Sequence, residues 1–306
     1  MAWNTYTVGT AALDDSLVLA FSDLVYFGAQ PQMIVDQLAI ANDNIVGKSL
    51  QISKYSDLTQ VTSALTELDE DTAEAMTDSS VVITPAQYGK STIRTELSRF
   101  QTGGKVDRAA AIAIANNMAR SLDGLGFAAL EGGSPLTTIY PNGKTAVTQL
   151  GDGDVLDKTF ANRLYNKLAR RNTPPKVNGL YAAIAHDDVL YDLRDSMTDI
   201  LKYSLPPEML RNAVGVFGGF VWYRDGLCAV TANASGTFDS YKVLAIGDNV
   251  LIKGTSQQPQ IVITGPFDRL GRFLNVGWKG TLQYTILDGN NMVFGVCTSS
   301  VGANAS

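Results

Sequence analysis

KVDRAAAIAIANNMARSLDGLGFAALE, residues 105–131, is the stretch of sequence that decides the fold. Alanine is the strongest helix former, Asp107 can cap the start, and Gly132 marks the end. One apolar stripe recurs every four residues: Ala110, Ile114, Met118 and Leu122. At about 1.5 Å per residue, such a helix reaches roughly 35–40 Å, which is long for a compact domain. Gly124 and Gly126 either weaken its second half or permit close packing.

A second helix follows the first, and its spacing predicts residues 154–171. Its apolar residues again lie four apart: Leu156, Phe160, Leu164 and Leu168. Aspartates at its start and bases at its end complement the helix dipole. Beyond it, 179–185 is predicted as a buried strand, 186–195 as a short helix and 213–223 as a buried turn and strand.

The C-terminal part of the chain is rich in predicted strands, at 241–247, 260–264, 280–287 and 292–300. Residues 288–291 contain Asp, Gly and two Asn, which predicts a hairpin between the last two strands.

The segment before the long helix, residues 48–95, is strand-like at both ends. Leu50, Ile52 and Lys54 alternate on one side, and residues 79–95 are rich in β-branched side chains. Between them, residues 66–78 carry six carboxylates without a base: Glu67, Asp69, Glu70, Asp71, Glu74 and Asp78. This pattern predicts a long two-stranded loop with a charged tip. A two-stranded ribbon is marginally stable alone, so we expect it to lie on a partner.

Basic side chains on an adjacent subunit would reduce the repulsion among these carboxylates. The candidate bases are Lys90, Arg94, Arg99, Arg170 and Arg171. A solvated acidic loop of a single domain is equally compatible with the sequence.

The first 47 residues contain neither Lys nor Arg. Leu13, Leu17, Phe21 and Leu24 have helical spacing, and a second short helical pattern runs through 34–38. We expect an arm of small helices that needs something else to pack against.

Composition excludes several classes of protein. The chain has 306 residues, a net charge of −6 and a pI of about 4.8, which argues against a dedicated nucleic-acid binder. Charged residues make up 18%, against roughly 25% in soluble domains, and a low charge content favours obligate assembly. The longest charge-free apolar stretch, 213–223, is too short for a bilayer, which needs about 20 residues.

No motif predicts an active site, a cofactor or a metal. Three Gly-Lys-Ser/Thr triplets lack the earlier glycine of a phosphate loop, and the acidic run lacks the spacing of a calcium loop. The single histidine, His186, is expected to cap or hydrogen-bond its own turn. Cys228 and Cys297 are too few for a disulfide framework or zinc site and are expected to be buried.

The order of these elements resembles the major capsid proteins of tailed bacteriophages, which have the α+β Johnson fold. Each motif is weak alone, and their order carries the resemblance. The segments that are similar are VVITPAQYGKSTIRT (81–95), GLYAAIAHDDVLYDLR (179–194), AVGVFGGFVWY (213–223), YKVLAIGDNVLI (241–252) and PFDRLGRFLNVGWKGTLQYTILD (266–288). Asn249-Val250 departs from the family's pattern.

The resemblance implies a structural protein whose subunits form hexamers and pentamers, with the extended loop over a neighbouring subunit. It implies five parts: an N-terminal arm (1–47), an extended β-loop (48–95), a peripheral domain with a spine helix (96–150), an axial domain (151–240) and the closing strands of the peripheral domain (241–306).

The resemblance also implies partners and a location. The partners are the chain itself, a scaffolding protein, a portal, decoration proteins and weak non-specific contact with packaged double-stranded DNA, with no membrane. The location is the virion, assembled in the host cytoplasm. Two other readings stay open: an encapsulin-type cellular compartment shell, and an intracellular hydrolase with a β-rich lid.

Overall fold

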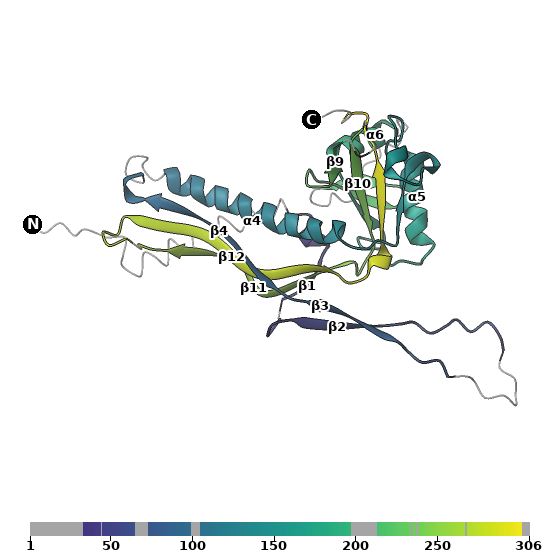
Figure 1. The fold of residues 1–306 in the computed structure, drawn as a ribbon, viewed down its shortest axis with the longest axis horizontal. Coiled ribbons are helices and arrows are strands. Elements are labelled where there is room, and N and C mark those ends of the chain that lie inside the picture. Colours follow the sequence, from purple (N-terminus) through teal and green to yellow (C-terminus); the bar gives the residue numbers. More distant parts are fainter. Residues whose placement is uncertain are drawn as a thin grey trace, which may run out of the picture.

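The computed structural model describes most of the chain after the first 32 residues. The described residues are 33–43, 45–64, 73–98, 105–196 and 213–301, apart from the single positions 233, 235, 237 and 267. Figure 1 shows two sheets joined by a long helix, and a two-stranded ribbon that projects from their base.

The first sheet has four strands in the order β1-β11-β12-β4 (Ile40–Asn42, Leu251–Thr264, Phe273–Ile286 and Ala86–Thr95). Helix α4 (Lys105–Glu131) lies along this sheet, and its bounds are those predicted (Figure 1). Asp107 is therefore inside the first turn, not at the cap. The predicted stripe is buried from Ile114 to Leu122, against Trp278 and other residues of β12.

The second sheet has six strands on its main path, in the order β5-β13-β10-β6-β8-β7. Their bounds are Thr137–Ile139, Met292–Cys297, Ser240–Ile246, Tyr181–Ala185, Phe220–Arg224 and Ala213–Phe217, and β9 (Val230–Thr231) pairs with β10. Helices α5 (Lys158–Ala169) and α6 (Asp187–Asp195) pack on one face. Residues of the other face, such as Ile184 and Leu244, share a core with α4. Short 3₁₀ turns lie at η2 (Pro141–Gly143), η3 (Val147–Gln149) and η4 (Gly289–Asn291).

Helix α5 begins four residues later than predicted. Asp157 caps it by accepting a hydrogen bond from the backbone N–H of Phe160 at 2.7 Å. Asp154, the predicted start, instead accepts from the N–H of Gly151 at 2.8 Å and from Asn142. The sequence offers several aspartates that could cap this helix. Asp154 is engaged in hydrogen bonds within the preceding loop, so Asp157 serves as the cap.

The predicted hairpin at residues 288–291 is wrong. Strand β12 pairs with β11 and β4, whereas β13 pairs with β10 and β5 in the other sheet. The side chain of Asp288 accepts from the N–H of Asn290 at 3.0 Å and caps η4, which leads the chain from one sheet to the other.

The strands of the expected part 241–306 are divided between the two sheets. Strands β10 and β13 belong to the second sheet, and β11 and β12 belong to the first. Two further strands also lie outside the expected limits. Strand β5 joins the second sheet although it falls within 96–150, and β4 joins the first sheet although it falls within 48–95.

The N-terminal residues that the structure describes pack on their own subunit. Ile34 and residues of α2 (Val35–Leu38) are buried against α4, where a Cβ on Gly126 would lie 2.5 Å from Val35 Cγ1. Gly126 therefore serves close packing. Residues 33–42 of the predicted arm thus pack against α4 and β11 of their own subunit, and the helical pattern at 13–24 lies outside the described residues.

Candidate assembly surfaces

The ribbon is an antiparallel pair of strands, β2 (Leu50–Tyr55) and β3 (Asp78–Ile83), paired in register from Leu50↔Ile83 to Tyr55↔Asp78. It leaves the body beside β1 and β11 and projects beyond both sheets (Figure 1). Two strands have no sheet of their own to cover a face, so the side chains of the ribbon that do not meet the body stay exposed.

The root of the ribbon is fixed to the first sheet by a small apolar cluster. Ile83 is fully buried and packs with Ile45 and Ile252. A Cβ on Gly254 would lie 2.6 Å from both Ile45 and Ile83, so the absence of a side chain at this position lets the root approach β11. The root is therefore part of the subunit's core, unlike the rest of the ribbon.

An ion pair also holds the root. Lys54 Nζ lies 2.6 Å from Asp288 Oδ2, at the turn that connects the two sheets. Lys54 shares the inward side of β2 with Leu50 and Ile52, which was visible in the sequence. The pairing of Lys54 with Asp288 could not be seen in the sequence, because 234 positions separate the two residues.

Beyond the paired strands, the described limbs of the ribbon expose large apolar side chains. Val61 is 80% exposed and Met76 60%, and Tyr55, at the end of β2, is 64% exposed. Exposed apolar side chains on one projecting element make it a candidate interaction surface. The limbs are joined by Glu74, whose carboxylate accepts from both the N–H and the hydroxyl of Thr59, each at 2.8 Å. These bonds lower the pKa of Glu74.

The predicted acidic contact residues lie mostly outside the described part of the chain. Glu67, Asp69, Glu70 and Asp71 are among these, as is Arg99. The described candidates are dispersed within one subunit. Lys90 is exposed on β4, Arg94 is buried on the same strand, and Arg170 and Arg171 are exposed just after α5.

The described outward face of α4, from residue 109 onward, carries few charges. Among the exposed residues between 109 and 128, Arg120 alone carries a charge, while Ile112 is exposed and Asn117 accepts from the indole N–H of Trp278 at 2.9 Å. This face offers little to attract phosphate groups.

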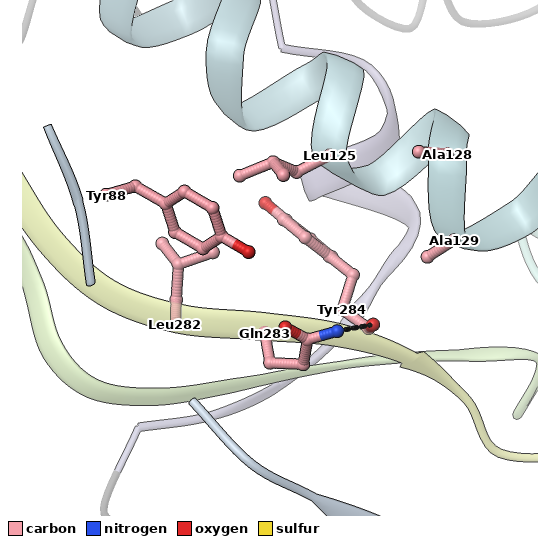
Figure 2. A pocket seen from close by; sticks show the side chains of 7 residues that line it. All are labelled: Tyr88, Leu125, Ala128, Ala129, Leu282, Gln283 and Tyr284. Carbon is pink, nitrogen blue, oxygen red and sulfur yellow. Dashed lines mark hydrogen bonds between the residues drawn. The ribbon is translucent and has the colours of Figure 1, made fainter. Parts of the chain in front are cut away.

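A hollow of about 260 Å³ lies between α4 and the first sheet. Figure 2 shows Tyr88, Leu125 and Tyr284 pointing towards it, and its remaining lining is Ala128, Ala129, Leu282 and Gln283. None of these lining residues is a carboxylic acid, a histidine or a cysteine.

The residues that suggested chemistry have structural roles. His186 caps α6, with Nδ1 accepting from the N–H of Asp188 at 3.3 Å, which confirms the predicted cap. Cys228 and Cys297 are buried as predicted, and burial raises the pKa of both thiols. Within the described ranges, no three His, Cys, Asp or Glu side chains gather closely enough to hold a metal ion.

Across the same described ranges, no helix has both the length and the apolar character needed to cross a membrane.

Comparison with known proteins gives no match by sequence, either to a family model or to a curated protein. The fold, in contrast, is matched by solved phage capsids. The capsid of Ralstonia phage GP4 has a TM-score of 0.70 and 12% identity over 86% of this chain and 87% of that one. The cyanophage Pam1 capsid has a TM-score of 0.66 and 14% identity, over 84% and 86% of the two chains.

A virus-like particle from Pyrococcus furiosus is also similar, with a TM-score of 0.55 and 11% identity over 91% of this chain and 98% of that one. The chain thus has the fold of phage capsid proteins, and the predicted α+β Johnson fold is confirmed.

Proposed function

We propose that this chain is a major capsid subunit, which assembles with copies of itself into the hexamers and pentamers of an icosahedral phage head that encloses double-stranded DNA. The observation that carries the proposal is the ribbon: β2 and β3 are anchored at Ile83 and Lys54, yet the limbs beyond them expose Val61 and Met76. Together with the capsid fold, this supports a lattice in which the ribbon lies on the next subunit.

The five parts keep the roles that the resemblance implies, with sheet membership as described above. On this proposal the ribbon is the extended loop, α4 is the spine helix, the first sheet forms the peripheral domain and the second sheet the axial domain. Residues 1–32 belong to the N-terminal arm.

The acidic segment 66–78 contacts bases on the adjacent subunit in this proposal. Lys90, Arg170 and Arg171 are the described candidates that are exposed. Arg94 is buried on β4, which makes it a weaker candidate. Exposed pairs contribute about 0–1 kcal/mol each, so the contact is collective and sensitive to salt.

The wider setting follows from the same proposal. A scaffolding protein and a portal act during assembly in the host cytoplasm, decoration proteins bind the finished head, and the subunit resides in the virion without enzymatic activity. The few charges on the described outward face of α4 support only weak, non-specific contact with packaged DNA.

An encapsulin-type compartment shell is the second candidate. The comparisons do not favour it, although the match to the Pyrococcus furiosus virus-like particle covers more of both chains than the Ralstonia phage match does. We rank the phage head above the compartment shell because the phage capsid has the higher TM-score.

Density-gradient sedimentation of the expressed chain, alone and with a scaffolding protein, tests the proposal when the fast fraction is imaged by electron microscopy. If the chain is a phage capsid subunit, we expect shells that are built of hexamers and pentamers and are large enough for a genome. Small closed shells without room for a genome would favour the compartment reading. A chain that stays monomeric under both conditions would contradict both.

A further inference from the structure

A buried carboxyl group lies where the N-terminal segment, the long helix and the second sheet meet. Asp123 is on α4 and is 2% exposed. It accepts hydrogen bonds from the N–H groups of Ile34, at 3.1 Å, and Val35, at 2.8 Å, at the start of α2. Asp123 therefore adds two hydrogen bonds to the apolar packing that holds the N-terminal segment on α4.

A second carboxyl group reaches the first from the other sheet. Asp225, directly after β8, makes a side-chain hydrogen bond with Asp123. Ionised carboxylates only accept hydrogen bonds, so a bond between two carboxyl groups requires one shared proton. Asp225 is itself held in place, because its N–H donates to Ala185 O at 3.1 Å and its Oδ1 accepts from the N–H of Leu227 at 2.8 Å.

The surroundings of the pair supply little positive charge. The titratable groups around the pair are Glu131 on α4, Asp36 on α2, Lys253 on β11, Tyr284 on β12 and Cys228 just before β9.

Among these groups the one cation, Lys253, already forms an ion pair with Asp36. Lys253 Nζ lies 2.6 Å from Asp36 Oδ1, and Asp36 also accepts from the Tyr284 hydroxyl at 2.7 Å. Glu131 accepts from the N–H of Ala229 at 2.8 Å. Burial first, and then Asp225, raise the pKa of Asp123 to about 7, although its backbone hydrogen bonds oppose the shift.

We propose that Asp123 and Asp225 form a proton-dependent latch between the N-terminal segment and the second sheet, closed while the two carboxyl groups share a proton and weakened when both ionise. The latch lies within one subunit and does not depend on the function proposed above.

The direction of the pH dependence follows from linkage. In the open state the Asp123 carboxyl has its ordinary pKa of 3.8, whereas in the closed state the pKa is about 7. Between these values the open state has released a proton that the closed state keeps, so the opening constant rises by up to about tenfold per pH unit. Above about pH 7 it becomes constant. The latch is thus strongest in acid.

Hydrogen exchange on the unassembled full-length chain tests this between pH 5.5 and 8.5. Exchange is corrected for the intrinsic effect of pH and read at Ile34, Val35 and residues 227–229. We expect the opening constant to rise by about tenfold or more between pH 5.5 and 7, and then to level off.

Two variants replace the shared proton with a permanent donor. In Asp123→Asn and in Asp225→Asn, the amide can donate to the remaining carboxylate, so we expect the pH dependence at Ile34 and Val35 to disappear in each. If Asp123→Asn fails to fold, the pH profile of Asp225→Asn alone tests the proposal. Asp154→Asn, which alters another buried carboxyl, is the matched control and should keep the wild-type profile. A flat wild-type profile, or a wild-type slope in the folded Asn variants at position 123 or 225, would overturn the proposal.

Discussion

Lys54 and Asp288 form an ion pair, with Nζ and Oδ2 separated by 2.6 Å, that ties the ribbon to the turn between the two sheets. The Lys54 side chain is 40% exposed and that of Asp288 is 19% exposed, so water screens the pair only in part. The pair and the Ile83 cluster act at the root, where they set how the ribbon leaves the body.

We therefore predict that Lys54→Gln and Asp288→Asn each speed hydrogen exchange in residues 50–55 of the free subunit, with a loss of stability of about 0–1 kcal/mol. Asparagine can still cap η4, so the Asp288 variant tests the charge. Because the two residues act as one pair, the double variant should exchange no faster than either single one. Fully additive effects would show that they act separately. Lys90→Gln, at an exposed position on β4, is the control and should leave these residues unchanged.

Two glycines of α4 provide a matched test of how the N-terminal segment packs. A Cβ on Gly126 would lie 2.5 Å from Val35 Cγ1, whereas a Cβ on Gly124 would have no atom within 4 Å. We predict that Gly124→Ala raises the free energy of unfolding by about 0.5–1 kcal/mol through helix propensity. Gly126→Ala should lower it by about 1–3 kcal/mol through overpacking. Urea unfolding of the subunit measures both, and effects of the same sign would contradict the described packing of α2 on α4.

The ion pair between Lys176 Nζ and Asp248 Oδ1, at 2.7 Å, gives a prediction with pH. The hydrogen bond from Lys176 is the main cause that lowers the pKa of Asp248 below its usual value of 3.8. A lowered pKa contributes stability above that usual value, and this stability is lost as pH falls through the folded-state pKa. Lys176→Met should therefore reduce stability at pH 7 and have less effect in strong acid. An equal effect of the substitution at both pH values in thermal unfolding would show that Lys176 acts through packing alone.

The helices and the strand patterns were predictable because each depends on neighbouring residues. The stripe from Ile114 to Leu122 and the alternation of Leu50, Ile52 and Lys54 both appear as predicted. Pairing between strands was not predictable in the same way. Leu282 and Phe294 are both buried strand residues, yet they lie in different sheets, and nothing local separates them.

The candidate assembly surface could be predicted only in outline. The ribbon followed from two strand patterns, whereas its anchors, Lys54–Asp288 and Ile83–Ile252, join residues far apart in the sequence. Asp123 also gave no signal, because an aspartate inside a helix usually faces solvent and only the fold places it against Val35.

The acidic segment gives a prediction about assembly. We expect the combined change Glu67→Gln, Asp69→Asn, Glu70→Gln and Asp71→Asn to alter shell assembly in a manner that depends on salt, because the charges act on a neighbouring subunit. Light scattering against ionic strength measures this. Asp152→Asn with Asp195→Asn removes exposed charges elsewhere and should leave the salt profile unchanged. Unchanged assembly of the four-residue variant at every ionic strength would exclude this contact.

The central claim is that the ribbon becomes ordered by a neighbouring subunit. Hydrogen exchange of free subunits and of assembled shells tests it most directly. The account predicts that the limbs of the ribbon beyond its root, residues 56–64 and 73–77, exchange quickly in the free subunit and slowly in the shell, while α4 and α5 stay protected in both. Equal protection of the ribbon in the two states would mean that it is held by its own subunit, and would contradict the account.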